Sequence, residues 1–175
     1  MIKIRKAIVN DAEIISLMGR ITFSDTFEVF FNKKDDLSAY LDNTFSVAKI
    51  KASLRKNENV YWIALHNDLP VGYAKLKLNS TSGLVTQTKV CQLQKIYVLK
   101  SFMSMGIGKQ LHNTLMEEAI ALDYEYIWLS VLEENERAIT FYEKETYEKT
   151  GKHTFQIGSQ IFVFYTMCKK LPMQD

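Results

Sequence analysis

The sequence predicts an α/β fold in which helices flank a central sheet. Two patterns carry this prediction. Runs of alternating or continuous apolar residues, typical of strands, recur from the N-terminus almost to the C-terminus. Segments with apolar residues at helical spacing lie between them. The chain has 175 residues, with 7 Gly, 2 Pro and no linker-like stretch, so we expect one domain over residues 1–175.

The first third of the chain is predicted to contain one strand followed by helices. Residues 2–5 alternate apolar and polar side chains, as a half-buried strand does. Asn10-Asp11 can cap a helix, and an apolar stripe follows from Ile14 to Ile21. Residues 22–41 are aromatic and mixed in charge, which indicates broken helices, and residues 45–56 form a further helix.

The middle of the chain is predicted to hold a hairpin, a third strand and a long helix. Residues 60–65 and 71–78 are strand-like and flank a turn at His66-Asn67-Asp68. After a polar loop, a third strand covers about residues 89–99. A helix then opens at Met105-Gly106-Ile107-Gly108 and reaches about Leu122.

The last part of the chain adds a buried strand, a helix and a final hairpin. The strand covers residues 126–131, and the helix covers residues 135–144. Gly158-Ser159 separates the hairpin strands at 155–157 and 160–167. Residues 161–167 are apolar on both faces, a pattern compatible with a homodimer formed through a sheet edge or a sheet face.

Composition and charge exclude several classes of protein. Lys and Arg number 22 and Asp and Glu number 20, and the formal net charge of +2 argues against a nucleic-acid or anionic-membrane binder. No apolar run reaches the ~20 residues of a membrane span. Cys91 and Cys168 are expected to be reduced thiols in a cytoplasmic protein. The three histidines lack metal-ligand spacing, so no metal site is expected.

A strand that runs through Gly106-x-Gly108 into a helix is the sharpest local signal. The first turn of a helix has unpaired N–H groups and a positive dipole end, which together attract an anion. Glycine lets that anion approach the backbone closely. The alternative is a tight strand-to-helix turn without a ligand. The segment lacks the patterns of nucleotide hydrolases and of dinucleotide-binding proteins.

Four patterns in order along the chain resemble the GCN5-related N-acetyltransferase (GNAT) superfamily. They are Ile96-Tyr97-Val98, Gly106-Ile107-Gly108, Trp128-Leu129-Ser130-Val131 and Asn135-x-x-Ala138-x-x-Phe141-Tyr142-x-Lys144. The resemblance covers nearly the whole chain. Within the superfamily the sequence is most similar to PaiA-type spermidine/spermine N-acetyltransferases, through segments 22–27, 40–41, 100–102 and 150–155.

The resemblance implies a mixed sheet of about seven strands with splayed central strands, about four helices, and acetyl-coenzyme A (acetyl-CoA) as cosubstrate. It implies that the backbone of Ile96, Tyr97 and Val98 pairs with the pantetheine arm. The pyrophosphate would lie on the loop from the strand to the helix, and further contacts would come from the second motif. The residues concerned are Met103, Ser104, Met105, Gly106, Ile107, Gly108, Lys109, Asn135, Ala138, Phe141, Tyr142 and Lys144.

The reaction implied is direct attack of a free amine on the thioester, with Tyr142 as the general acid. A phenol, with an ordinary pKa of about 10, stays protonated at neutral pH. The general base has no clear candidate. Gln92 and Gln94 occupy the strand where the family often has glutamate, and a neutral amide accepts no proton. A tyrosine, Asp25 or Glu28 through water, and bulk solvent remain alternatives.

Two further positions depart from the family pattern. Met103 replaces a preferred Gln or Arg, which should weaken pyrophosphate binding because a charge-assisted hydrogen bond contributes about 1.5–3 kcal/mol. Thr146 stands where Gly usually ends the second helix, so local strain or a different turn is expected.

The acceptor implied is a small-molecule amine, with a polyamine as the first hypothesis. A polyamine needs acidic residues, and the candidates are Asp25, Glu28, Asp35, Asp36, Glu133 and Glu134, although such runs are also typical of a solvated surface. Two alternatives stay open. One is a catalytically weakened regulatory module that binds acyl-CoA, and the other is a protein N-acetyltransferase.

Overall fold

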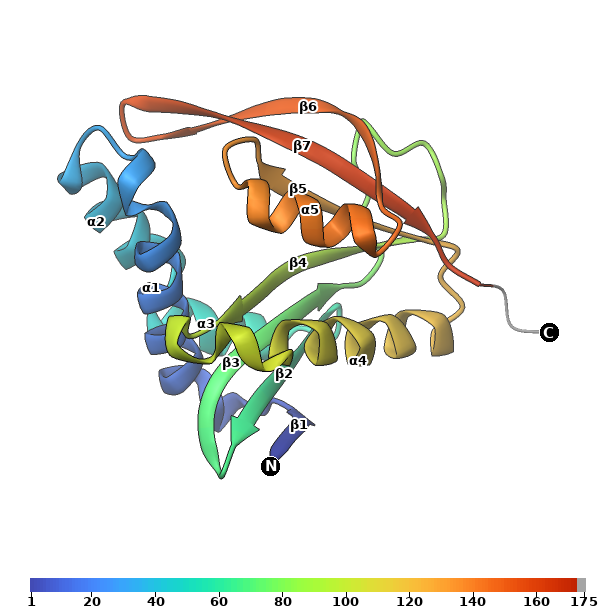
Figure 1. Ribbon diagram of the computed structural model, residues 1–175, viewed down its shortest axis with the longest axis horizontal. Helices are drawn as coiled ribbons and strands as arrows, with labels where there is room; N and C mark the ends of the chain where they lie inside the picture. Colours follow the sequence, from blue (N-terminus) through green and yellow to red (C-terminus); the bar gives the residue numbers. More distant parts are fainter. Residues whose placement is uncertain (173–175) are drawn as a thin grey trace.

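A computed structural model describes residues 1–172 and shows one seven-stranded mixed sheet with helices on both faces (Figure 1). The strands are β1 (Ile2–Lys6), β2 (Asn59–His66), β3 (Leu69–Lys77), β4 (Val90–Val98), β5 (Tyr126–Leu132), β6 (Glu148–Ile157) and β7 (Gln160–Lys170). The α-helices are α1 (Ala12–Phe27), α2 (Lys34–Thr44), α3 (Val47–Leu54), α4 (Ile107–Ala121) and α5 (Glu136–Lys144). The resemblance implies about seven strands, as found, and about four helices, whereas the described residues contain five α-helices.

The sheet order is β1-β2-β3-β4-β5-β7-β6. Strands β1 to β4 are antiparallel neighbours, and β4 pairs with β5 in parallel. The predicted β2–β3 hairpin is confirmed: Asn67 and Asp68 take φ angles of 49° and 64°, as a tight hairpin turn requires.

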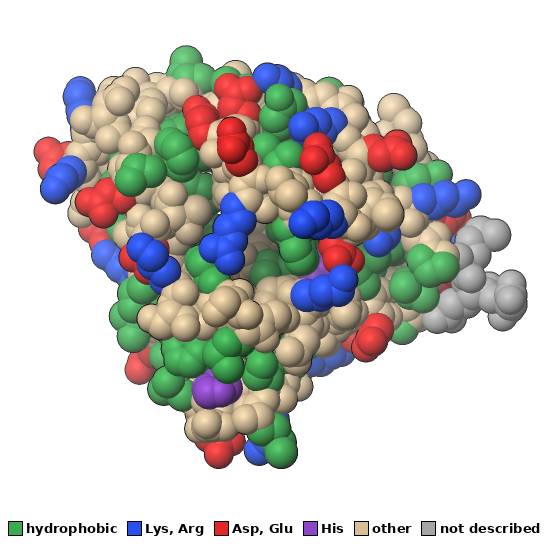
Figure 2. Space-filling model, in the orientation of Figure 1, with side chains coloured by type: hydrophobic (Ala, Val, Ile, Leu, Met, Phe, Trp, Pro, Cys, Tyr) green, Lys and Arg blue, Asp and Glu red, His purple; other side chains and the backbone are tan. Residues whose placement is uncertain are grey.

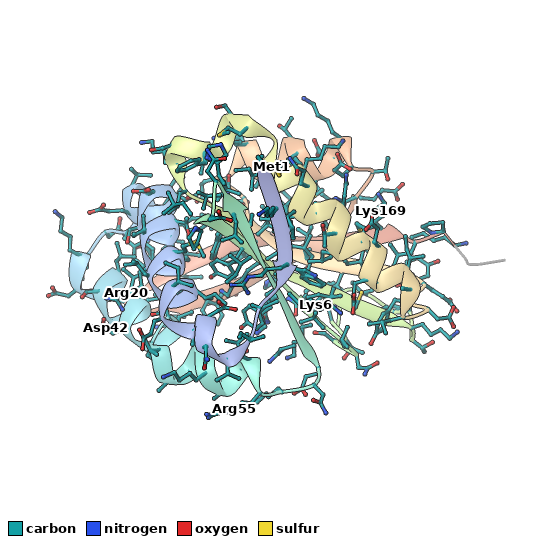
Figure 3. All side chains as sticks on the ribbon, turned by 90° about the horizontal axis from the view of Figure 1, so that it is seen from below. Met1, Lys6, Arg20, Asp42, Arg55 and Lys169 are labelled. Atoms are coloured by element: carbon teal, nitrogen blue, oxygen red, sulfur yellow. The ribbon has the colours of Figure 1, made fainter. Side chains whose placement is uncertain are left out.

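Two apolar layers cover the sheet. Helix α4 packs on one face, where Ile107, Leu111 and Leu115 are fully buried in the largest core cluster. Helices α1 and α3 pack on the other face, against the side chains of β2 and β3. Figure 3 shows Arg20 of α1 beside Asp42 of α2, and their ion pair measures 2.8 Å. None of the described helices is long and apolar enough to span a membrane.

The broken helices predicted for residues 22–41 are present. Helix α1 ends at Phe27, and a 3₁₀ turn (Glu28–Phe30) separates it from α2. The tip of the β6–β7 hairpin holds this break in place. Asp36 accepts hydrogen bonds from the backbone N–H and the hydroxyl of Ser159, at 3.0 and 2.7 Å. Gln160 donates to the carbonyl of Phe30 at 2.7 Å.

The C-terminal hairpin differs from its prediction in two ways. Strand β6 begins at Glu148 rather than near Phe155, because its first residues are mostly exposed and polar and carry no apolar signal. Strand β7 pairs with β5 on one side and with β6 on the other. Residues 164–167 are therefore paired on both sides and offer no free sheet edge for a homodimer. The oligomeric state itself stays a prediction.

Candidate active site

The site begins where the central strands separate. β4 and β5 pair only from Val90↔Tyr126 to Gln92↔Trp128, and beyond that point they diverge. A register shift opposite Lys75 and Leu76 leaves Gln94 as an extra residue in β4, and such a bulge bends the strand. The predicted splay is thus present. It leaves the β5-facing edge of β4 from Leu93 to Val98 without a neighbouring strand.

A cavity of about 490 Å³, here called the loop cavity, opens beside this free edge. Figure 2 shows the surface hollowed between α5 and the N-terminal end of α4, with Lys and Arg side chains bordering the hollow. Twelve of the residues predicted to bind the cofactor line it: Ile96, Tyr97, Val98, Met103, Ser104, Gly106, Gly108, Lys109, Asn135, Ala138, Phe141 and Tyr142.

The N-terminus of α4 forms one end of the loop cavity. Gly106 precedes the helix with φ 72° and ψ 10°, a left-handed conformation that glycine adopts without strain. The N–H groups of Ile107, Gly108 and Lys109 belong to the first helical turn, so they have no partner within the helix. They point a positive dipole end toward the cavity. Lys109 adds a charge there, although its ammonium group also pairs with Glu145 at 2.8 Å.

Arg137 of α5 is a site residue that sequence reasoning missed. It lines the loop cavity, and its guanidinium nitrogen lies 3.1 Å from the sulfur of Met103. The guanidinium of Arg137, from α5, therefore lies beside Met103, the position where the family prefers a polar or charged side chain. Its sequence position gives no such signal, because an exposed arginine on a helix is ordinary.

Asn135 and Tyr142 link the loop cavity to a second cavity. The side-chain oxygen Oδ1 of Asn135 caps α5 by accepting from the backbone N–H of Ala138 at 3.2 Å, which leaves the side-chain amide nitrogen as a donor. Burial raises the pKa of the Tyr142 hydroxyl well above its usual value, so the hydroxyl is protonated at neutral pH and can donate. Both residues line both cavities.

The second cavity, here called the aromatic cavity, measures about 240 Å³. Nine of its lining residues are aromatic: Phe23, Phe27, Phe31, Tyr40, Tyr97, Tyr142, Phe155, Phe162 and Phe164. They come from α1, the following turn, α2, β4, α5 and the β6–β7 hairpin. The helical spacing of the early phenylalanines is compatible both with core packing and with the lining of an acceptor cleft. They do pack on one another, and they also form the wall of this cavity.

The carboxylates proposed from the sequence lie elsewhere. Of the residues that the structure describes, neither Asp nor Glu lines either cavity. Asp36 is bound to Ser159, and Glu133 pairs with Lys152 at 2.7 Å. Asp25 and Glu28 are exposed and outside both linings, so neither is placed to serve as the base.

The glutamines and tyrosines of the site are also unsuited to act as the general base. Gln94 lines the aromatic cavity, whereas Gln92 accepts a hydrogen bond from Ser80 at 3.0 Å outside it. Burial raises the pKa values of Tyr40 and Tyr97. A tyrosine base is therefore disfavoured, because deprotonating a buried phenol is costly.

Three predicted cofactor residues lie outside the lining of the loop cavity. The side chain of Ile107 is fully buried in the core, so only its backbone faces the loop. Met105 and Lys144 are exposed. The backbone strain predicted at Thr146 is present, because this residue takes a left-handed φ of 66°. The backbone N–H groups of Thr146 and Tyr147 donate to the carbonyls of Glu143 and Tyr142, respectively, both at 3.0 Å. This pattern is a Schellman turn with threonine at the position that favours glycine.

Comparisons with known proteins agree with this geometry. The model of the acetyltransferase (GNAT) family matches residues 22–146. An uncharacterized N-acetyltransferase of Lactobacillus delbrueckii subsp. lactis is 27% identical over 141 residues, which are 81% of each chain. An uncharacterized N-acetyltransferase of Mycobacterium tuberculosis is 25% identical over 137 residues, 78% of this chain and 83% of that protein.

Solved structures share the fold. The PaiA N-acetyltransferase of Thermoplasma acidophilum in complex with coenzyme A gives a TM-score of 0.76 at 18% identity, covering 97% of this chain and 99% of that one. The ribosomal-protein-S18-alanine N-acetyltransferase of Escherichia coli gives 0.74 at 14% identity, covering 100% and 97%. With a family model matched over most of its length, this chain belongs to the GNAT family of acetyltransferases.

Proposed function

We propose that the protein transfers an acetyl group from acetyl-CoA directly to the primary amine of a small molecule. One observation carries the proposal: the loop cavity and the aromatic cavity meet at a shared wall that includes Ile96, Asn135 and Tyr142. A donor in one cavity and an acceptor in the other would thus come together at a protonated phenol, with no covalent enzyme intermediate needed.

The loop cavity fits a cofactor with a polyphosphate end and an amide-bearing arm. First-turn N–H groups of α4, with Arg137 and Lys109, suit the phosphates. The free edge of β4 beyond Gln92 offers backbone donors and acceptors to the amides of the arm. Asn135, the N-cap residue of α5, lines the same space, and its side-chain amide nitrogen can donate to the arm.

The residues at the shared wall have separable tasks. When bound, acetyl-CoA supplies a thioester carbonyl that an amine can attack. Tyr142 donates its proton to the departing sulfur. With no carboxylate in either lining among residues 1–172, the ammonium proton of the acceptor passes to water, and Gln94 and Ser130 are neutral partners that can orient this water. The reaction rate should therefore rise with pH as the free amine becomes more abundant.

A regulatory acyl-CoA-binding module remains the second candidate, because the aromatic cavity holds Gln94 and no carboxylate of the described chain. Thiol release from acetyl-CoA with a panel of amines separates the two. The panel includes phenylalanine, alanine, spermidine and a short peptide. Turnover with any amine supports the enzyme, whereas tight acetyl-CoA binding without turnover supports the module.

Tyr142→Phe tests the mechanism. It should lower kcat roughly 100-fold, because general acid catalysis contributes about 10²–10⁴. The Kd for acetyl-CoA, measured by calorimetry, should stay within about twofold, since the ring is retained. An unchanged kcat would remove Tyr142 from the chemistry.

A further inference from the structure

The aromatic cavity has the size and walls of a site for one ring. Its volume of about 240 Å³ is below the roughly 300–1,000 Å³ of pockets for drug-sized ligands. The rings that form it brace one another: Phe23 lies 4.8 Å from Tyr40, and Phe31 lies 4.9 Å from Phe162, between ring centroids. Rings at these separations prefer tilted or edge contacts, which a further aromatic group can extend.

The charge of this cavity is positive. Lys95 is its one charged lining residue in the described part of the chain. Lys75 lies directly opposite Lys95 in the β3–β4 register, and Lys49 of α3 adds to the positive potential. A polyamine, which carries several positive charges, would meet a cation here instead of the carboxylates that it needs.

Lys95 lacks an anionic partner. Its ammonium group lies 4.8 Å from the centroid of Phe45 and 5.5 Å from that of Tyr97, so ring faces give it part of its stabilisation. Among residues 1–172, no carboxylate oxygen lies within 4.0 Å of it. Burial lowers its pKa to about 8, so it is still mainly charged at neutral pH. A bound anion would offset this desolvation.

We propose that the acceptor is an aromatic amino acid, with its ring in the aromatic cavity, its carboxylate on Lys95 and its α-amino group beside Tyr142. The inference rests on the proposed function and names its substrate class. The amino and carboxylate groups share one carbon, so their partners must be close. Lys95 and Tyr142 both line the aromatic cavity, so one ligand in it can meet both side chains.

The transfer balances without a further reactant. The neutral α-amino nitrogen bonds to the acetyl carbonyl carbon while the carbon–sulfur bond breaks. The sulfur takes the proton of Tyr142, the nitrogen loses a proton to water, and Tyr142 regains one from water. The products are an N-acetyl amino acid and free coenzyme A.

The test compares L-phenylalanine, L-phenylalaninamide, L-alanine and spermidine as acceptors for wild type, Lys95→Met and Lys56→Met. Phenylalanine should give the highest kcat/KM. Lys95→Met should lower this value about tenfold to hundredfold, the range for a lost charge-assisted hydrogen bond, and leave phenylalaninamide within about threefold. Lys56→Met removes an exposed lysine outside both cavities and should change neither.

Each outcome separates the inference from the proposed function. Faster turnover of spermidine or alanine than of phenylalanine overturns the inference while the enzyme stands. Equal losses for phenylalanine and its amide in Lys95→Met overturn the carboxylate contact. If no amine reacts, the proposed function fails, and the proposed binding of an aromatic amino acid is then tested by thermal denaturation. Phenylalanine must raise the Tm of the coenzyme A complex in wild type and not in Lys95→Met. A shift equal in both, or absent, overturns the inference.

Discussion

Lowering the pH from 7 to 4 should destabilise the protein through one buried imidazole, His112 on α4. This side chain is 1% exposed. Its Nε2 lies 3.1 Å from the hydroxyl of Tyr147, and its Nδ1 has no hydrogen-bond partner among the described atoms. Its ring meets Phe141 edge to face, with 5.7 Å between centroids. His112 therefore supports α5, the helix that carries Tyr142.

The magnitude follows from the pKa of the imidazole. Burial lowers this pKa from 6.5 to about 4, although the nearby carboxylate of Glu145 opposes the shift. The unfolded chain takes up a proton as the pH falls below 6.5, and the folded protein does so only near pH 4. The stabilisation is thus complete above pH 6.5 and is lost between the two values. At 1.36 kcal/mol per unit, the loss is about 3 kcal/mol.

Urea denaturation at several pH values from 4 to 8 measures this effect. His112→Gln should show a free energy of unfolding that falls about 3 kcal/mol less than that of wild type on acidification. Carboxylates also titrate in this range, but they are common to both proteins and cancel in the difference. Tyr147→Phe removes the hydroxyl partner and keeps the imidazole, so its pH dependence should resemble that of wild type. Parallel curves for wild type and His112→Gln would refute the reasoning.

Three further substitutions test other features. Arg137→Ala should weaken acetyl-CoA binding about tenfold by calorimetry, because a cation over the loop is lost; an unchanged Kd would show that this guanidinium does not meet the cofactor. Thr146→Gly should stabilise the protein by roughly 0.5–1 kcal/mol, since relief of the left-handed strain exceeds the entropy cost of glycine, and an equal or lower urea midpoint would contradict this. Gly158→Ala should destabilise the protein by roughly 1–3 kcal/mol, because the added Cβ would lie 2.2 Å from Asp36 and the residue has a φ of 57°. The control Gly83→Ala, whose Cβ would have nothing within 4 Å, should leave the stability unchanged. Equal urea midpoints for the two variants would count against the contact.

Local patterns predicted the loop cavity well. The strand, the turn at Gly106 and the first turn of α4 are consecutive in sequence, so their geometry follows from short-range rules. Thr146 was likewise readable, because a helix end that needs a left-handed residue is a local requirement. Most of the predicted loop residues accordingly line one cavity.

The closure of the aromatic cavity could not be predicted from local patterns. Phe31 and Phe162 pack together although strands β2 to β6 lie between them in sequence, and no periodicity within either segment indicates the other. The carboxylates that the polyamine hypothesis requires lie outside the cavity for a similar reason. Asp36 and Glu133 have local sequence contexts compatible with a binding site, but their partners, Ser159 and Lys152, come from the C-terminal hairpin.

The contacts that tie the C-terminal hairpin to the break between α1 and α2 bear on the order of folding. They join residues 123 and 130 positions apart, Asp36 to Ser159 and Phe30 to Gln160. Closing so long a loop has a high entropy cost, so these contacts should form after the local β2–β3 hairpin and the β4–α4 unit. Under the proposed function, the half that holds acetyl-CoA would then exist before the acceptor wall is complete. Selection of the amine would thus depend on contacts that form late in folding.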